Sequence, residues 1–88
     1  MDGQIRRLSM RKMKEGIQTL NVIEFIITKN FWEYYVIEID ENDIAFCLVD
    51  GFEIELGYVC LNEIKPYISC RTKDLTRIEP ARGWKWVN

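Results

Sequence analysis

The segment from Ile44 to Ile64 constrains the fold more than any other part of this sequence. It begins with an uninterrupted apolar run that ends at Val49, passes through the dipeptide Asp50-Gly51, and resumes as Glu-Leu-Gly-Tyr. A short apolar run bounded by turn residues is typical of a β-strand, and Asp-Gly is a common turn dipeptide. We therefore expect two neighbouring strands, followed over residues 61–67 by a short helix.

The residues before this segment predict two further strands. Residues 22–28 are β-branched and apolar, and Lys29-Asn30 is a plausible turn. Residues 31–39 alternate, which assigns one face of a strand to Glu33, Tyr35, Ile37 and Ile39. The polar cluster at residues 40–43 forms the next turn. Because short turns join neighbouring strands, residues 21–60 are expected to form an antiparallel meander of three to four strands.

The two ends of the chain complete the expected architecture. Residues 1–18 carry apolar side chains near helical spacing with basic side chains between them, so a basic amphipathic helix is expected. Such a helix either packs its apolar stripe on the sheet or binds nucleic acid or a membrane surface. Residues 71–88 are expected to give an edge strand and a tail. The predicted fold is a single α+β domain, with an N-terminal helix, the meander, and a short helix after the last core strand.

The composition indicates a small soluble globular domain. The chain has 88 residues, of which 48% are hydrophobic and 30% charged. Its apolar runs are too short to cross a bilayer, and the basic N-terminus is not followed by the apolar region of a secretory signal. We expect a cytoplasmic protein without a membrane partner.

Charge is distributed unevenly along the chain. Residues 21–63 contain ten acidic residues and one basic residue, whereas both flanking segments are net basic. One interpretation is that the basic ends fold over the acidic middle and neutralise it. The other is that an acidic face is exposed and competes for a basic groove on a partner.

Few residues of this chain are suited to catalysis or metal binding. There is no histidine, and the three cysteines have no close spacing, so a nucleophile–base pair, a zinc site and a disulfide framework are all disfavoured. The acidic cluster at residues 40–43 lacks the glycine and the spacing of a calcium loop, and no glycine-rich phosphate loop is present. The acidic cluster at residues 50–55 lies in a loop and could hold a hard cation, but an exposed acidic turn is its usual explanation. We expect a protein that is not an enzyme and has no metal or cofactor, with Cys47 and Cys60 buried as reduced thiols.

The tail from Arg82 to Trp86 interleaves aromatic and basic residues. Trp84 and Trp86 share a strand face by alternation, so they either pack against the sheet, anchor a protein partner, or stack on nucleic-acid bases. These three alternatives remain open.

Parts of the sequence are similar to a known family. The motif over residues 48–64, with Glu-Leu-Gly-Tyr followed by Leu61 and Glu63, resembles the core of the family called domain of unknown function 2958. Residues 34–40, residues 73–75 and Pro80 extend the resemblance over roughly residues 20–80, although Val59 and Cys60 replace an aromatic residue and a serine. The resemblance implies a small protein of conjugative plasmids, phages and other mobile elements, with a role against host defence.

Together these observations predict a non-enzymatic inhibitor of a host nucleic-acid-processing defence complex, of anti-CRISPR or antirestriction type. It would act by steric and electrostatic occlusion of a basic effector protein. An alternative is a nucleic-acid-binding accessory module that uses the basic termini. The residues predicted to contact a protein partner are Asp40, Glu41, Asp43, Asp50, Phe52, Glu53, Glu55, Trp84 and Trp86. The residues predicted to contact nucleic acid in the alternative function are Arg6, Arg7, Arg11, Lys12, Arg82 and Lys85.

Overall fold

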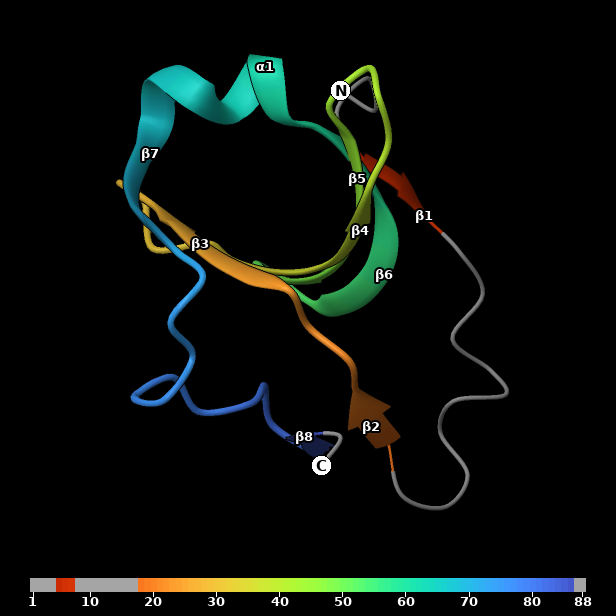
Figure 1. Cartoon of the computed structure of the whole chain (residues 1–88), viewed down its shortest axis with the longest axis vertical. Helices are drawn as coiled ribbons and strands as arrows, with labels where there is room; N and C mark the ends of the chain where they lie inside the picture. Colours follow the sequence, from red (N-terminus) through yellow and green to blue (C-terminus); the bar gives the residue numbers. More distant parts are fainter. Residues whose placement is uncertain (1–4, 8–17, 87–88) are drawn as a thin grey trace.

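The computed structural model describes residues 5–7 and 18–86, and its main element is a curved six-stranded antiparallel sheet (Figure 1). The strand order is β1-β6-β5-β4-β3-β7, and the central four strands follow one another in sequence as the expected meander. A second sheet pairs two short strands, β2 and β8, in parallel. The bounds of the strands are Ile5–Arg7 (β1), Gln18–Leu20 (β2), Glu24–Thr28 (β3), Glu33–Ile39 (β4), Ile44–Asp50 (β5), Ile54–Cys60 (β6), Ile68–Thr72 (β7) and Trp84–Trp86 (β8).

The helical content of the described residues is small. Helix α1 spans Leu61–Ile64 and continues into the 3₁₀ turn η2 at Lys65–Tyr67, where Pro66 lies at the start of the turn. This matches the short helix expected over residues 61–67. The predicted α+β class is nevertheless wrong, because most of the regular structure is antiparallel sheet.

The predicted N-terminal helix over residues 1–18 is also wrong where the structure describes that segment. Residues 5–7 form β1, which pairs with β6, and Gln18 begins β2. Without β1, the outer edge of β6 would present a row of unpaired backbone groups, and satisfying them favours an extended segment there. The rest of the helix prediction, residues 1–4 and 8–17, lies outside the described residues.

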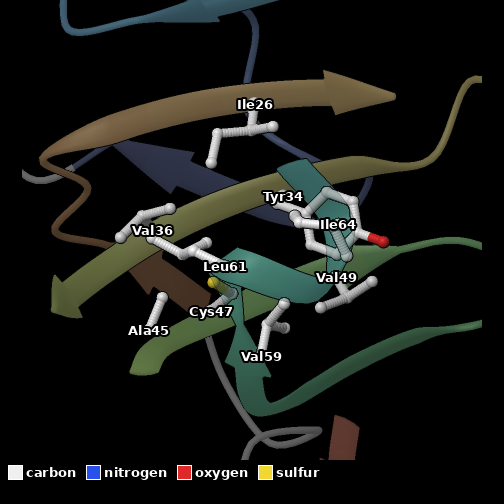
Figure 2. Close-up of a cluster of buried hydrophobic side chains, with 9 residues drawn as sticks. All are labelled: Ile26, Tyr34, Val36, Ala45, Cys47, Val49, Val59, Leu61 and Ile64. Atoms are coloured by element: carbon white, nitrogen blue, oxygen red, sulfur yellow. The ribbon is translucent and has the colours of Figure 1, made fainter. Parts of the chain in front are cut away.

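Each face of the sheet has its own apolar cluster. Figure 2 shows the first cluster, in which α1 lies over the sheet and contributes Leu61 and Ile64. The strands supply the other seven buried members, which are Ile26, Tyr34, Val36, Ala45, Cys47, Val49 and Val59.

The second cluster packs the sheet against the C-terminal segment. Figure 1 shows this segment on the opposite side of the sheet from α1. The buried strand residues of this cluster include Tyr35 and Leu48, and the C-terminal segment contributes Ala81 and Trp84. The alternation of β5 divides its side chains between the two clusters, with Cys47 and Val49 in the first and Leu48 in the second. The C-terminal segment is therefore a layer of the fold.

A β-bulge changes the face assignment predicted for β4. Residues Val36 and Glu38 pair with the adjacent residues Cys47 and Phe46, so Ile37 is the extra residue. Beyond the bulge the alternation is offset by one, which places Ile39 against the first cluster although Tyr35 and Ile37 belong to the second. The sequence pattern alone had assigned Ile39 to the face of Tyr35.

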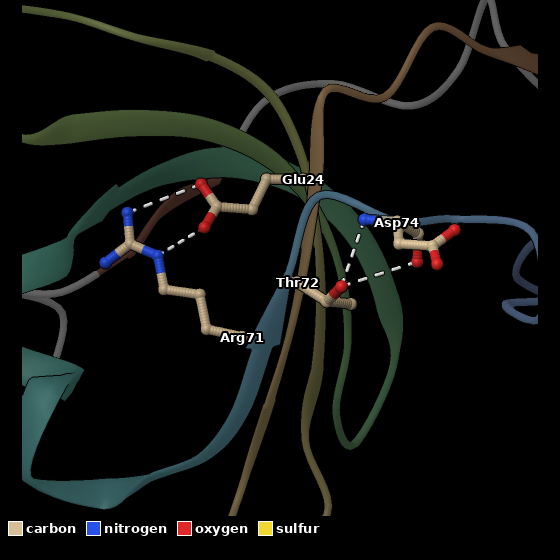
Figure 3. Close-up of polar contacts among 4 residues, drawn as sticks. All are labelled: Glu24, Arg71, Thr72 and Asp74. Atoms are coloured by element: carbon tan, nitrogen blue, oxygen red, sulfur yellow. Dashed lines mark hydrogen bonds and ion pairs between the residues drawn. The ribbon is translucent and has the colours of Figure 1, made fainter.

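The edge strand expected at the start of residues 71–88 lies earlier in the chain, at Ile68–Thr72. Strand β7 pairs with β3 and ends at Thr72, whose hydroxyl accepts a hydrogen bond from the backbone N–H of Asp74 at 3.0 Å (Figure 3). A side-chain bond of this kind holds a turn, so the chain leaves the sheet here. Residues 84–86, expected in the tail, form β8.

The burial of Trp84 predicts a large effect on stability. Its side chain is 8% exposed, so Trp84→Ala is expected to lower the free energy of unfolding by about 3–5 kcal/mol. The neighbouring Lys85 is exposed, and Lys85→Ala should change stability by less than about 0.5 kcal/mol. Urea denaturation followed by tryptophan fluorescence measures both. Equal midpoints for the two variants would contradict a C-terminal segment that covers the sheet.

Candidate functional site

The carboxylates predicted to bind a partner are divided between the two ends of β5. The turn at residues 40–43 precedes this strand, and the turn at residues 51–53 follows it. Strands rise about 3.3 Å per residue, so a seven-residue strand separates the two turns by roughly 20 Å. The structure therefore does not bring the predicted residues together in one site.

The first end is formed by Asp40, Glu41 and Asp43 of the turn and by Glu63 of α1, and we call these four residues the acidic end. All four are exposed. The backbone N–H of Leu61 donates to the carbonyl of Asp43 at 3.0 Å, which fixes the start of α1 against the turn. Four carboxylates are thus held on two connected elements.

Asp40 also has a structural role in the turn. Its Oδ1 accepts hydrogen bonds from the backbone N–H groups of Asn42 at 2.8 Å and Ile44 at 3.0 Å. Asp43 has a φ of 61°, a left-handed conformation that aspartate tolerates better than most residues. Glu41 has neither role, so its carboxylate is the more informative one to substitute.

Within residues 21–86, the carboxylate that forms an ion pair does not belong to the acidic end. There, the one ion pair joins Arg71 of β7 to the buried Glu24 of β3, with the second Arg71–Glu24 hydrogen bond at 3.3 Å (Figure 3). The hydrogen bond with Glu24 is the main factor that raises the pKa of Arg71, and the charges of Glu24 and Asp43 raise it further, against the effect of burial. Asp43 thus influences Arg71 from beyond ion-pair distance.

The opposite end of the sheet is aromatic. Trp32 and Phe52 meet edge to face with ring centroids 5.1 Å apart. A Cβ atom at Gly51 would lie 2.6 Å from the Trp32 ring, so only glycine permits this close approach. Phe52 itself is 93% exposed. Asp50 lies directly before this turn and is half-buried.

Two further aromatic residues lie on the same end, and neither was predicted as a site residue. Phe31 is 80% exposed and has a φ of 68°, and Tyr67 is 58% exposed. The backbone N–H of Lys29 donates to the carbonyl of Tyr67 at 2.8 Å, which joins this turn to η2. We call Phe31, Trp32, Phe52 and Tyr67 the aromatic end. The tertiary contact between residues 29 and 67 has no counterpart in the sequence pattern.

The tryptophans of the tail, and the described basic residues of the nucleic-acid-binding alternative, lie elsewhere in the structure. Trp84 is buried and Trp86 half-buried in the second cluster, where the Trp86 indole N–H donates to the carbonyl of Ile78 at 3.2 Å. Arg82 and Lys85 are exposed. Arg6 and Arg7 lie in β1 at the edge of the large sheet, whereas Arg11 and Lys12 fall outside the described residues.

A polar hollow of about 500 Å³ lies between the sheet and the C-terminal segment. In it, the Tyr35 hydroxyl lies 3.0 Å from Oε1 of Glu33 and 3.2 Å from the carbonyl oxygen of Glu79, and its single proton can be donated to either acceptor. Burial raises the pKa of Tyr35, and the charge of Glu33 adds to this effect. These bonds tie the C-terminal segment to the sheet, and they leave the phenol protonated at neutral pH.

The described residues hold no group of three or more cysteine or carboxylate side chains arranged for a metal ion. Cys47 is buried, Cys60 half-buried and Cys70 exposed, all as free thiols. Glu53 and Glu55 lie in the turn after β5 and in β6, and both interact with other groups of the protein.

Comparison with protein-family models, with curated proteins and with solved structures found no match for this chain. Among the residues that the structure describes, no helix is long and apolar enough to span a membrane.

The role of Asp40 in its turn gives a matched pair of substitutions. Asp40→Ala removes the acceptor of two backbone N–H groups and is expected to lower the free energy of unfolding by about 1–2 kcal/mol. Glu41→Ala removes the same charge from the same turn and should leave stability within about 0.5 kcal/mol. Thermal unfolding of the two variants measures the difference. Similar losses in both would show that charge, rather than the hydrogen bonds, determines stability at this turn.

The buried thiol predicts a dependence of stability on alkaline pH. Burial, with a smaller contribution from the charge of Glu24, raises the pKa of Cys47 from 9.0 to about 12. The thiol therefore contributes stability fully below pH 9, and this contribution is lost as the pH rises towards 12.

Labelling of single-cysteine variants tests the same burial. A variant that retains Cys47 should react with a maleimide only as fast as the protein unfolds, whereas one that retains the exposed Cys70 should react immediately. Rapid labelling of Cys47 in the folded protein would contradict the first cluster as described.

Proposed function

We propose that this protein is a non-enzymatic inhibitor that occupies the basic nucleic-acid channel of a host defence effector, of anti-CRISPR or antirestriction type. The acidic end is the contact surface, and it excludes the nucleic acid by its bulk and its negative charge. The family resemblance of residues 20–80 supports an origin on a phage, plasmid or other mobile element. This origin is part of the proposal.

The observation that carries the proposal is that the four carboxylates of the acidic end are exposed and form no ion pair within residues 21–86. Asp40, Glu41, Asp43 and Glu63 are all exposed, and within residues 21–86 none of them lies within 4.0 Å of a lysine or arginine nitrogen. Carboxylates held this way raise the rate of encounter with a basic surface, and they repel nucleic acid. The turn and α1 are connected by a backbone hydrogen bond, so little ordering is needed on binding.

The chemistry of the described residues supports a binding role. The most conspicuous buried hydroxyl, that of Tyr35, is committed to hydrogen bonds that hold the fold. The buried thiol of Cys47 has a raised pKa, which disfavours the nucleophilic thiolate. The raised pKa values of Tyr35 and Cys47 thus disfavour the deprotonated, nucleophilic form of both side chains.

Charge reversal at the acidic end tests the proposal. Glu41→Lys and Glu63→Lys are expected to weaken binding to a purified defence effector by roughly tenfold each, about 1.4 kcal/mol, chiefly by slowing association. In cells that carry the defence, both variants should reduce the protection of an infecting phage, measured as plating efficiency. The probes are nucleic-acid-guided nucleases and restriction endonucleases of the host.

The matched control is Glu79→Lys, which makes the same change at an exposed residue of the C-terminal segment. It should keep wild-type binding and protection. If all three variants protect phage as well as the wild type does, the acidic end is not the contact surface. Tight, salt-sensitive binding of the wild-type protein to plain duplex or single strands would instead favour the nucleic-acid-binding alternative.

A further inference from the structure

The polar hollow between the sheet and the C-terminal segment is not used by the proposed function. Its volume of about 500 Å³ lies within the roughly 300–1,000 Å³ that is common for small-molecule sites. One wall belongs to strands β3, β4 and β5, and the other is formed by residues 77–82 of the C-terminal segment. The lining combines apolar side chains with charged side chains of both signs, which is a composition suited to a ligand.

The sheet wall holds two carboxylates side by side. Glu33 of β4 and Asp50 of β5 are register partners in the antiparallel pair, which places their Cβ atoms about 5 Å apart. Both are half-buried, and both line the hollow. Neither has a counter-ion within residues 21–86, where the one ion pair joins Arg71 to Glu24. Like charges directly opposite each other destabilise a sheet, so a cation bound between these two carboxylates would stabilise it.

The opposite wall holds two guanidinium groups. Arg77 and Arg82 line the hollow from two turns of the C-terminal segment, at residues 75–78 and 81–84. Backbone hydrogen bonds of 3.1 and 2.9 Å close these turns. Neither arginine forms an ion pair with a carboxylate of residues 21–86. A guanidinium group is suited to bind a carboxylate through two parallel hydrogen bonds, so this wall favours an anion.

The two walls are held together by a buried side chain. Tyr35 is 2% exposed, and its hydroxyl lies within hydrogen-bond distance of both Glu33 on the sheet and the carbonyl of Glu79 on the C-terminal segment. The Tyr35 ring meets that of Phe25 edge to face, with centroids 5.2 Å apart, and both rings line the hollow. The site is therefore formed before a ligand binds, which lowers the entropic cost of binding.

We propose that this hollow binds a small zwitterion in which an amine or guanidinium group is separated from a carboxylate by an aliphatic chain, as in a basic amino acid. The cation lies between Glu33 and Asp50, and the carboxylate binds Arg77 and Arg82. A ligand with a single charge would leave one wall unmatched, so a zwitterion binds more tightly than either a simple cation or a simple anion. The acidic end is not part of this hollow, so this proposal and the proposed function can fail separately.

An NMR titration of the full chain tests the site. The probe is 6-aminohexanoate, and its matched controls are hexylamine and hexanoate, which each lack one of its two charges. At constant ionic strength, 6-aminohexanoate should shift the amide signals of residues 33–35, 50 and 77–82, with a dissociation constant of about 10 mM or lower. Each control should bind at least about tenfold more weakly. If 6-aminohexanoate causes no localised shifts, or if hexylamine binds equally well, the proposal is wrong.

Substitutions on each wall test the two charge contacts. Asp50→Asn and Arg82→Gln should each raise the dissociation constant for 6-aminohexanoate by about tenfold or more. Glu38→Gln and Lys85→Gln are the matched controls, because they neutralise exposed charges on β4 and β8 outside the hollow. Wild-type affinity in both Asp50→Asn and Arg82→Gln would overturn the proposal.

The stability of the protein without ligand gives an independent test. Asp50→Asn removes one of the two opposed carboxylates, so it should raise the midpoint of thermal unfolding relative to the wild type. A lower midpoint would show that the arginines of the C-terminal segment already neutralise this pair in solution, and it would contradict a hollow whose charges are open to a ligand.

Discussion

The burial of β5 on both faces is the constraint on which the rest of this structure depends. Antiparallel partners β4 and β6 satisfy its backbone on both sides, and its side chains alternate between the two apolar clusters. Cys47, Leu48 and Val49 are all almost fully buried as a result. In a domain this small, a strand that is buried on both sides requires a cover for each face. Helix α1 provides one cover, and the C-terminal segment provides the other.

The central meander could be predicted from sequence because its signals are local. The apolar run of β5, the alternation of β4 and the intervening turns each specify a strand within a few residues. The α1–η2 segment was predictable for the same reason, since Pro66 marks its turn. The observed bounds of these elements differ by only a few residues from the bounds expected from the sequence.

The remaining features depend on contacts between distant residues. β1 and β7 are edge strands whose conformation follows from the open edges of β6 and β3, and β8 pairs with a strand more than sixty residues earlier. The bulge at Ile37 is likewise set by pairing with β5, so alternation alone misassigned Ile39. Phe31 and Tyr67 escaped prediction because the turn between β3 and β4 meets η2 only in the folded chain, through the hydrogen bond from the Lys29 N–H to the Tyr67 carbonyl.

The same strand separates the acidic end from the aromatic end. The turns that carry them lie before and after β5, so a contact made at one of these surfaces leaves the other uncovered.

Native-state hydrogen exchange tests the central claim most directly. The amides of residues 47–49 should exchange only through global unfolding, whereas those of the turns at residues 41–43 and 51–53 should exchange faster by orders of magnitude. Exchange in the middle of β5 as fast as in its flanking turns would contradict a strand buried on both faces, and with it the fixed separation of the two surfaces.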